Sequence, residues 1–254
     1  MKHQSRSATA ANAAYYNSMP PGLEDYWNLM AAPRFRANTL CRLILGARPS
    51  AIVELGCGNG RLLVELGERG FAGRRLGIDL SENRISANKA LVPAVDWLNA
   101  NLELPGEVPV AERGTFDAVV ACELIEHVTD PARLLASARS LAMPDTGTLF
   151  LSTQSGPVGA TERFVGHQRH FSAREMDPLL RSAGWEPLRI WNTGFPFHDL
   201  SKWIASRRPV AMIERFNDRA YGPTEKAVCL VLRSLFKLNS STRGAQLFAI
   251  ARAR

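Results

Sequence analysis

The segment AIVELGCGNGRLLVELGERG, residues 51–70, decides the fold. A short apolar run, AIVEL, precedes three closely spaced glycines, and the following RLLVELGERG has apolar residues at helical spacing. This order predicts a strand, a tight turn and a helix. In an open parallel sheet, the first such turn lies at the carboxyl end of its strand, beside the bound ligand. We therefore place a ligand at residues 56–60.

The glycine spacing indicates which kind of ligand this is. The turn at residues 56–60 has the spacing G-x-G-x-G, and Arg61 stands where the dinucleotide fingerprint G-x-G-x-x-G has its third glycine. Glu54 precedes the turn, and its negative charge would repel a pyrophosphate but attract a cation. Asp79 ends another predicted strand, where a carboxylate accepts hydrogen bonds from ribose hydroxyls. The expected ligand therefore carries a ribose and a positive charge but no phosphate.

Strand-like and helix-like segments alternate along most of the chain. This alternation predicts a parallel sheet with helices on both faces. Two further strands near the C-terminal end complete a doubly wound, seven-stranded, mostly parallel α/β sheet. Ser172 and Glu175 have the S-x-x-E spacing of a capping box, so a helix is expected to start there. The predicted strands are residues 51–55, 74–79, 94–98, 116–121, 147–153, 185–192 and 244–253.

The remaining segments are predicted to close over this sheet. Residues 1–33 are expected to form an N-terminal tail and lid helices, and residues 34–254 the main domain. Residues 195–243, before the last strand, are rich in aromatic residues and arginine and are predicted to be a helical insertion. The insertion is expected to be a lid or pocket wall, with a membrane-surface contact, a dimer contact or a plain scaffold as alternatives. The residues expected on the other side of the pocket, or in a helix core, are Tyr15, Tyr16, Tyr26 and Trp27.

The composition argues against several classes of protein. The chain of 254 residues has a formal net charge of +7, but its arginines are spread without a basic block, which disfavours nucleic acid as a partner. Its 4 cysteines have no C-x-x-C spacing, so neither a zinc knuckle nor a disulfide framework is predicted. The N-terminal segment lacks the apolar core of a secretory signal, and no apolar run approaches the roughly 20 residues that span a bilayer. A cytoplasmic protein is expected.

Four motifs along the chain resemble those of a known enzyme family. VELGCGNG, GIDLSENRI, FDAVVACELIEHVTDP and GTLFLST are similar, in order and spacing, to the motifs of class I S-adenosylmethionine-dependent methyltransferases. ELIEHVTDP and GHQRHFSAREMDPLLRSAGW resemble the branch with the ubiquinone-biosynthesis O-methyltransferases and many small-molecule methyltransferases. The resemblance implies a Rossmann-like fold and methyl transfer from S-adenosylmethionine to an oxygen or nitrogen of a small molecule, in a biosynthetic role. An RNA 2′-O-methyltransferase with a divalent metal and a non-catalytic S-adenosylmethionine-binding protein are the alternatives.

The resemblance also assigns residues to the cofactor. Glu54 is expected near the methionine amino group, and Asp79 at the ribose. Asn101 stands where the family has an aspartate near the adenine amino group, and an amide offers a different donor pattern there. Arg36 has the spacing of a cofactor-side arginine, or is a solvated arginine on an amphipathic helix. The full predicted set is Arg36, Glu54, Gly56, Gly58, Asp79, Leu80, Asn101, Leu102 and Cys122.

Three histidines are candidates for handling a substrate proton. Methyl transfer to a hydroxyl or amine requires that group to lose a proton, either to a base or with the help of a metal. His127 follows the fourth predicted strand, and His167 and His170 lie in the long loop after the fifth. Because these strands end at the same edge of the sheet, all three histidines are predicted catalytic residues.

The same region has the spacing of a metal site. If residues 123–127 form one helical turn, Glu123, Glu126 and His127 lie on one side of it. This Glu-x-x-Glu-His pattern with a distant histidine resembles the metal site of small-RNA 2′-O-methyltransferases, and a similar pattern occurs in the ubiquinone-type enzymes. The predicted ligands of a divalent cation are Glu123, Glu126, His127 and His167, with magnesium as first choice and zinc, manganese or iron better suited to mixed donors. In the alternative, Glu126 caps a helix and His127 packs in the core.

Overall fold

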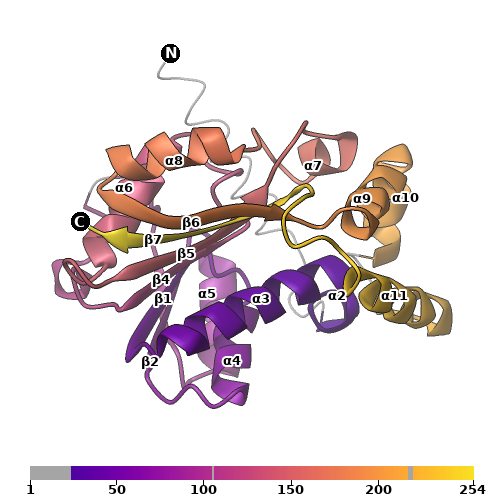
Figure 1. Cartoon of the computed structure of the whole chain (residues 1–254). Helices are drawn as coiled ribbons and strands as arrows, with labels where there is room; N and C mark the ends of the chain where they lie inside the picture. The colour runs from indigo at the N-terminus through magenta and orange to yellow at the C-terminus, as the bar shows by residue number, and fades with distance from the viewer. Residues whose placement is uncertain (1–23, 105, 217–219) are drawn as a thin grey trace.

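A seven-stranded sheet runs through the centre of the computed structural model, which describes residues 24–104, 106–216 and 220–254 (Figure 1). Its strands are β1 (Ala51–Leu55), β2 (Arg74–Asp79), β3 (Asp96–Asn99), β4 (Ala118–Cys122), β5 (Thr148–Gln154), β6 (Trp185–Thr193) and β7 (Gln246–Ala253). The spatial order is β3-β2-β1-β4-β5-β7-β6, and β7 pairs antiparallel with β5 and β6 while the pairs among β1 to β5 are parallel. The predicted doubly wound, mostly parallel sheet is confirmed.

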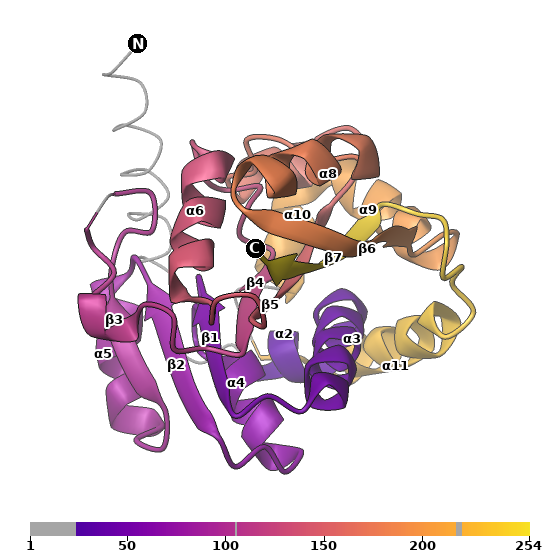
Figure 2. The same cartoon turned by 60° about the vertical axis from the view of Figure 1, so that its left-hand side comes forward.

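Helices cover both faces of the sheet (Figures 1 and 2). Each group buries its apolar side chains in a separate core cluster against the strands. The central strands are therefore buried on both faces, which is why their sequences are nearly continuous apolar runs. One face carries α3 (Ala31–Ala47), α4 (Arg61–Glu68) and α5 (Glu82–Leu91), and the other carries α6 (Pro131–Leu141) and α8 (Ala173–Ser182).

N-capping side chains that can be recognised in the sequence determine where α6 and α8 begin. Ser172 Oγ accepts a hydrogen bond from the Glu175 N–H, and the Glu175 carboxylate accepts one from the Ser172 N–H at 2.8 Å, so the predicted capping box is confirmed. Asp130 caps α6 by accepting from the Arg133 N–H at 3.1 Å, with Pro131 at the first helical position. These starts fix where the loops before α6 and α8 end.

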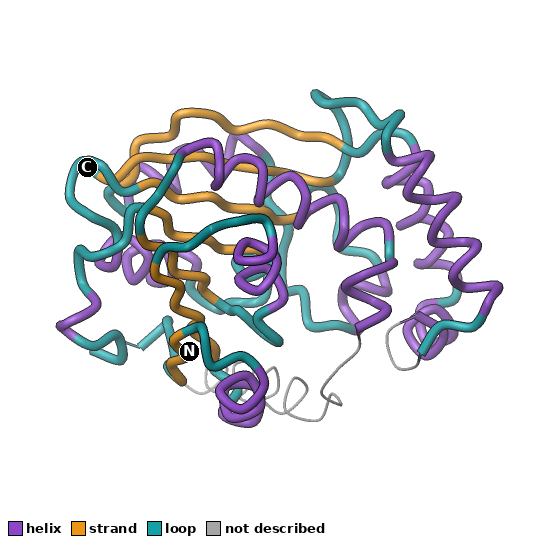
Figure 3. The backbone as a smooth tube through the Cα atoms, turned by 90° about the horizontal axis from the view of Figure 1, so that it is seen from below, coloured by secondary structure: helices purple, strands orange, loops and turns teal. Residues whose placement is uncertain are grey.

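A third group of helices gathers beyond the carboxyl ends of the strands (Figures 1 and 3). A small apolar cluster formed by Phe216, Tyr221 and Cys229 lies there, and Leu29 of the N-terminal segment packs against it. Asp25 also accepts a hydrogen bond from the Tyr221 N–H at 2.7 Å. The group consists of α2 (Glu24–Leu29), α7 (Ala160–Phe164), α9 (Phe197–Arg207), α10 (Pro209–Phe216) and α11 (Pro223–Phe236).

The predicted insertion, residues 195–243, contains α9, α10 and α11. Tyr15, Tyr16 and most of the predicted N-terminal segment lie outside the described residues. A short 3₁₀ helix, η1 (Val110–Glu112), precedes β4. Over the parts of the chain that the structure describes, no helix combines the length and the apolar character needed to cross a membrane.

Candidate active site

A cavity of about 730 Å³ lies at the carboxyl ends of β1, β2 and β4. It extends from the glycine turn after β1 to side chains of α2, α9, α10 and α11. All the predicted cofactor-binding residues line it, as do His127, His167 and Glu123. The predicted residues His170 and Glu126 are not among the described residues that line it.

The glycine turn brings bare backbone to the wall of this cavity. Gly56 and Gly58 have φ angles of +64° and +53°, in the left-handed region that favours glycine. A Cβ atom on Gly56 would come within 2.6 Å of Leu124 Cδ1, whereas one on Gly58 would meet nothing within 4 Å. The Asp79 carboxylate accepts a hydrogen bond from the Gly58 N–H at 2.8 Å. The end of β2 therefore holds the turn in place.

Glu54 has a buried oxygen without a partner. Its side chain lines the cavity and is 4% exposed, and Oε2 has no hydrogen-bond partner among the residues described. Burial, together with the charge of Asp79, raises the pKa of Glu54 well above its usual range. An ammonium group would satisfy this oxygen and offset its charge. The cavity thus offers a place for a cation beside the glycine turn.

Asp79, Leu80 and Asn101 form the adjoining part of the wall. The two oxygens of Asp79 accept from the backbone N–H groups of Gly58 and Ser81, and each keeps a lone pair for a further donor. Leu80 is 36% exposed, so it offers an apolar surface on which a flat ring could pack. Asn101 Oδ1 accepts from a backbone N–H at 3.0 Å, which leaves its amide nitrogen as the group that suits an acceptor on the ligand.

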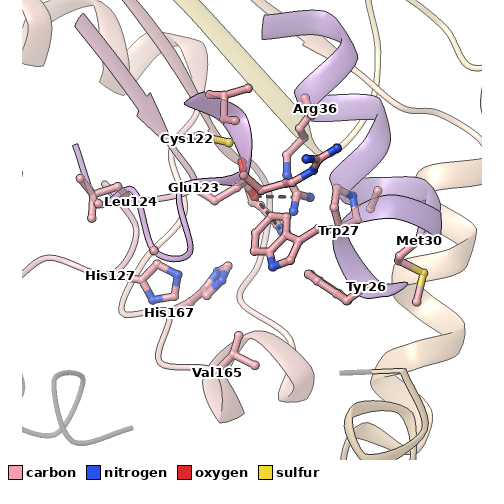
Figure 4. A pocket seen from close by; sticks show the side chains of 18 of the residues that line it. Tyr26, Trp27, Met30, Arg36, Cys122, Glu123, Leu124, His127, Val165 and His167 are labelled. Atoms are coloured by element: carbon pink, nitrogen blue, oxygen red, sulfur yellow. Dashed lines mark hydrogen bonds and ion pairs between the residues drawn. The ribbon is translucent and has the colours of Figure 1, made fainter. Parts of the chain in front are cut away.

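Arg36 and Glu123 form a buried ion pair beside Cys122 (Figure 4). Their nitrogen and oxygen atoms are 3.8 Å apart, and the two side chains are 9% and 14% exposed. Burial alone would raise the pKa of Glu123, but the Arg36 charge and a hydrogen bond from Gln246 at 2.9 Å lower it to about 2. Ser152 Oγ donates a further bond to this carboxylate at 3.1 Å. Glu123 is therefore an ionised anchor for Arg36.

Donor atoms of Glu126, His127 and His167 come together next to the cavity, which the two histidines line. One ligand-type atom of each residue lies within 4.8 Å of the others. Figure 4 shows His127 and His167 side by side, facing Tyr26 and Trp27 across the cavity. Glu126 is fully buried behind them, where Oε2 accepts from Thr153 Oγ1 at 2.7 Å and Oε1 has no partner among the described residues.

Burial sets the protonation of this cluster. It lowers the pKa of His127 to about 4, and together with neighbouring His127 it lowers the pKa of His167 to about 3. Both imidazoles are therefore neutral near pH 7, and a neutral imidazole has a nitrogen lone pair that can accept a proton or bind a metal. Burial and the charge of Glu123 raise the pKa of Glu126 well above its usual range.

The loop after β4 is a turn rather than the single helical turn considered from the sequence. Glu123 has a φ angle of +51°, and the His127 N–H closes the turn on the Leu124 carbonyl at 2.9 Å. Glu126 consequently lies in the core, while Glu123 faces Arg36. Glu123 is outside the group of three donors, and ligation by Glu123 stays a prediction that this geometry does not support.

Comparison with known proteins decides the family. Residues 32–190, more than half of the chain, match the model of a family described as a methyltransferase domain. The chain belongs to this family. The predicted resemblance to class I S-adenosylmethionine-dependent methyltransferases is thereby confirmed, and S-adenosylmethionine is the cofactor of this methyltransferase.

Curated relatives agree with this assignment, and a solved structure has a similar fold. The chain is 36% identical over 102 residues to the ubiquinone biosynthesis O-methyltransferase of Methylococcus capsulatus, but spans only 42% of that relative's length and 40% of its own. It is 34% identical over 181 residues to the Acinetobacter baylyi enzyme of the same name, covering 63% of this chain and 73% of the relative. The fold is similar to a Burkholderia thailandensis 1,6-didemethyltoxoflavin-N1-methyltransferase with bound S-adenosylhomocysteine, with a TM-score of 0.58, 17% identity and coverage of 98% and 89%.

The polar groups of the methyltransferase cavity fit this cofactor. The unpartnered oxygen of Glu54 suits the ammonium of the methionine arm, and the free lone pairs of Asp79 suit the ribose hydroxyls. The bare backbone at Gly58 allows close approach of a ligand. These roles, and those of the other predicted cofactor residues, stay proposals for individual residues.

One charged pair that lines the methyltransferase cavity was not predicted from the sequence. Lys202 Nζ lies 3.2 Å from the Glu162 carboxylate, and both residues line the cavity. A signal was present, because the residues of α9 that line the cavity include His198, Ser201, Lys202 and Ala205, at spacings of three, four and seven.

The aromatic residues of the insertion do not all line the cavity. Trp203 and Phe195 are 54% and 53% exposed and do not line this cavity, whereas Phe216 does. The insertion therefore contributes one helical face of α9 and parts of α10 and α11 to the wall, but not all of its aromatic side chains.

Asp79→Ala should weaken the binding of S-adenosylhomocysteine by about 1.5–3 kcal/mol, or about 10- to 150-fold in Kd. The variant loses both the expected ribose acceptor and the bond that holds Gly58. Calorimetric titration measures the effect, with Asp96→Ala at the exposed end of β3 as the matched control and NAD as a ligand that should not bind. An unchanged affinity would remove Asp79 from the cofactor site.

Proposed function

We propose that this protein transfers the methyl group of S-adenosylmethionine to an oxygen or nitrogen of a small molecule, with a hydroxyl oxygen favoured. The observation that carries the proposal is the cluster of Glu126, His127 and His167, whose two imidazoles line the cavity while the carboxyl of Glu126 is buried. A hydroxyl must lose its proton to become a good nucleophile, and neutral imidazoles in a buried place can accept it. An amine that is already neutral needs less help from such a cluster.

In the proposed reaction, the cofactor supplies a methyl group on a positively charged sulfur. His167, or His127 beside it, accepts the proton of the substrate hydroxyl as the oxygen attacks. The cavity walls align oxygen, methyl carbon and sulfur and exclude water, and such alignment can contribute roughly 7 to 11 kcal/mol. The ionised pair of Arg36 and Glu123 keeps the floor of the site in a fixed arrangement.

The charges around the cavity support a small molecule over RNA. Several of its lining cations face carboxylates: Arg34 lies 2.6 Å from Glu65, Lys202 lies 3.2 Å from Glu162, and Arg215 lies 2.7 Å from Glu225. Paired cations have little charge left for a phosphate backbone, whose neutralisation dominates nucleic-acid affinity. Apolar side chains such as Val165, Phe216 and Phe236 line the same cavity and suit an apolar substrate body.

A biosynthetic role in the cytoplasm is part of this proposal, supported by the relatives named for ubiquinone biosynthesis. A homodimer and a peripheral membrane contact through the insertion remain predictions. Exposed apolar residues of α11, including Leu230 and Val231, are the surface that either contact would use.

A labelling assay tests the function. The protein is incubated with S-adenosylmethionine labelled in its methyl group and separately with panels of phenols, catechols, primary amines and short RNA. We expect label on a hydroxyl-bearing small molecule, identified as an O-methyl product by mass spectrometry. Label on RNA alone would overturn the proposal, and tight S-adenosylhomocysteine binding with no labelled product across the panels would favour the non-catalytic alternative.

A further inference from the structure

A hydrogen-bonded chain lies behind the cavity wall at His167. His170 Nδ1 lies 3.1 Å from the Gly156 carbonyl oxygen, and His170 Nε2 lies 3.0 Å from His167 Nδ1. His167 lines the cavity, whereas His170 does not. The order from backbone to cavity is therefore Gly156, His170 and His167.

The loop that carries both histidines is held against the turn after β4. The Gln168 N–H donates to the Glu126 carbonyl at 2.9 Å, and the Gln168 side-chain amide donates to the His127 carbonyl at 2.9 Å. These two bonds fix the loop between His167 and His170 relative to the donor cluster. The relative placement of the two imidazole rings is thus set by backbone contacts as well as by their own bond.

The donor in each bond of this chain follows from the carbonyl at its end. A carbonyl oxygen only accepts, so the proton between Gly156 and His170 belongs to His170 Nδ1. A neutral imidazole carries one proton, which makes His170 Nε2 an acceptor. His167 Nδ1 must then donate to it. The lone pair of neutral His167 is consequently on Nε2, the nitrogen that has no part in this chain.

We propose that His170 is a positioning residue that holds His167 in the Nδ1–H tautomer, so that the lone pair of Nε2 serves the active site. This inference rests on the proposed function. In that reaction the substrate O–H bond breaks and its proton goes to His167 Nε2. An oxygen electron pair forms the bond to the methyl carbon, and the carbon–sulfur bond breaks to leave neutral S-adenosylhomocysteine. A histidine without the His170 partner favours the Nε2–H tautomer, which has no lone pair at that nitrogen.

The tautomer can be observed without any substrate. Long-range proton–nitrogen correlation spectra of ¹⁵N-histidine-labelled protein, recorded at alkaline pH in excess chelator, distinguish Nδ1–H from Nε2–H rings. We expect Nδ1–H signals for both His167 and His170 in the unaltered protein. In His170→Phe the His167 signal should shift toward Nε2–H. An Nε2–H ring at His167 in the unaltered protein, or an unchanged His167 ring in the variant, would overturn the inference.

Kinetics with rescue provide the second readout. His170→Phe should lower kcat by about 10- to 100-fold, the range for partners that orient a functional histidine, with the Kd of S-adenosylhomocysteine unchanged. His170→Gln should recover most of the rate, because an amide offers one donor to Gly156 and one acceptor to His167. Arg174→Ala, on the exposed surface of α8, is the control that should leave kcat unchanged.

The two proposals fail in different ways. If no methylated product forms, the proposed function fails while the tautomer measurement still decides the role of His170. If His170→Gln is as slow as His170→Phe in a folded protein of unchanged melting temperature, a donor and an acceptor at this place are not enough, and the positioning role is contradicted.

Discussion

His167→Ala should lower kcat by about 10²- to 10⁴-fold, the contribution typical of a general base. The imidazole lines the cavity next to His127, and burial keeps it neutral, so its loss removes a proton acceptor from the place where the substrate would lie. The Kd of S-adenosylhomocysteine should stay the same, because the proposed cofactor-binding groups are those around Glu54 and Asp79. Steady-state turnover with the substrate identified by labelling, together with calorimetric titration, measures both quantities.

The controls for this variant separate chemistry from folding. Arg174→Ala, on α8, should leave turnover unchanged, and the melting temperature of His167→Ala should show that the variant is folded. His127→Ala made in parallel tells which imidazole dominates. Turnover of His167→Ala within about threefold of the unaltered protein, against the 10²-fold lower limit for a base, would mean that the proton goes elsewhere.

The part of the fold that follows from local pattern was predictable. Residues 51–55 and 74–79 were predicted as strands and form β1 and β2 with those bounds, because an apolar run followed by a turn specifies a buried parallel strand. The third strand was predicted at residues 94–98 but spans Asp96–Asn99. It lies at the edge of the sheet, where one side is unpaired and polar ends are tolerated, so its apolar pattern fixes its limits only weakly.

The candidate site also has a part that could be predicted from local sequence pattern and a part that could not. The predicted cofactor residues line one cavity because the turn after β1 and the end of β2 are neighbours in any sheet of this order. Long-range contacts decide the rest. Glu123 adopts a left-handed conformation and faces Arg36, and Lys202 meets Glu162 from a helix 40 residues further along the chain. Single-sequence spacing carries no information on such pairs. The first depends on how α3 packs beside the loop after β4, and the second on how α9 packs against α7.

Treatment with excess chelator should lower turnover on the order of 10²-fold or more, because the activation free energy rises by several kcal/mol without the metal. One added divalent cation should restore turnover. Of the four predicted ligands, Glu126, His127 and His167 have donor atoms within 4.8 Å of one another, and Glu123 is not part of this group. The unpartnered Oε1 of buried Glu126 fits a cation, since a buried carboxylate oxygen without a partner is costly. A cation held there would lower the pKa of a substrate hydroxyl and fix its direction of attack, and His167 would then act as a ligand in place of a base.

Adding different cations and testing variants of the ligand residues distinguishes a specific metal site from a general effect of the chelator. Two imidazoles and one carboxylate suit zinc, manganese or iron better than magnesium, so each metal is added back separately. Titration of the chelator-treated protein with manganese or zinc should show one site that is lost in Glu126→Gln and His127→Ala. Asp177→Asn, a carboxylate change on the exposed surface of α8, should leave it intact. Full activity in excess chelator would assign the cluster to proton transfer by the histidines alone, because the carboxyl of Glu126 would then be neutral and hydrogen-bonded to Thr153.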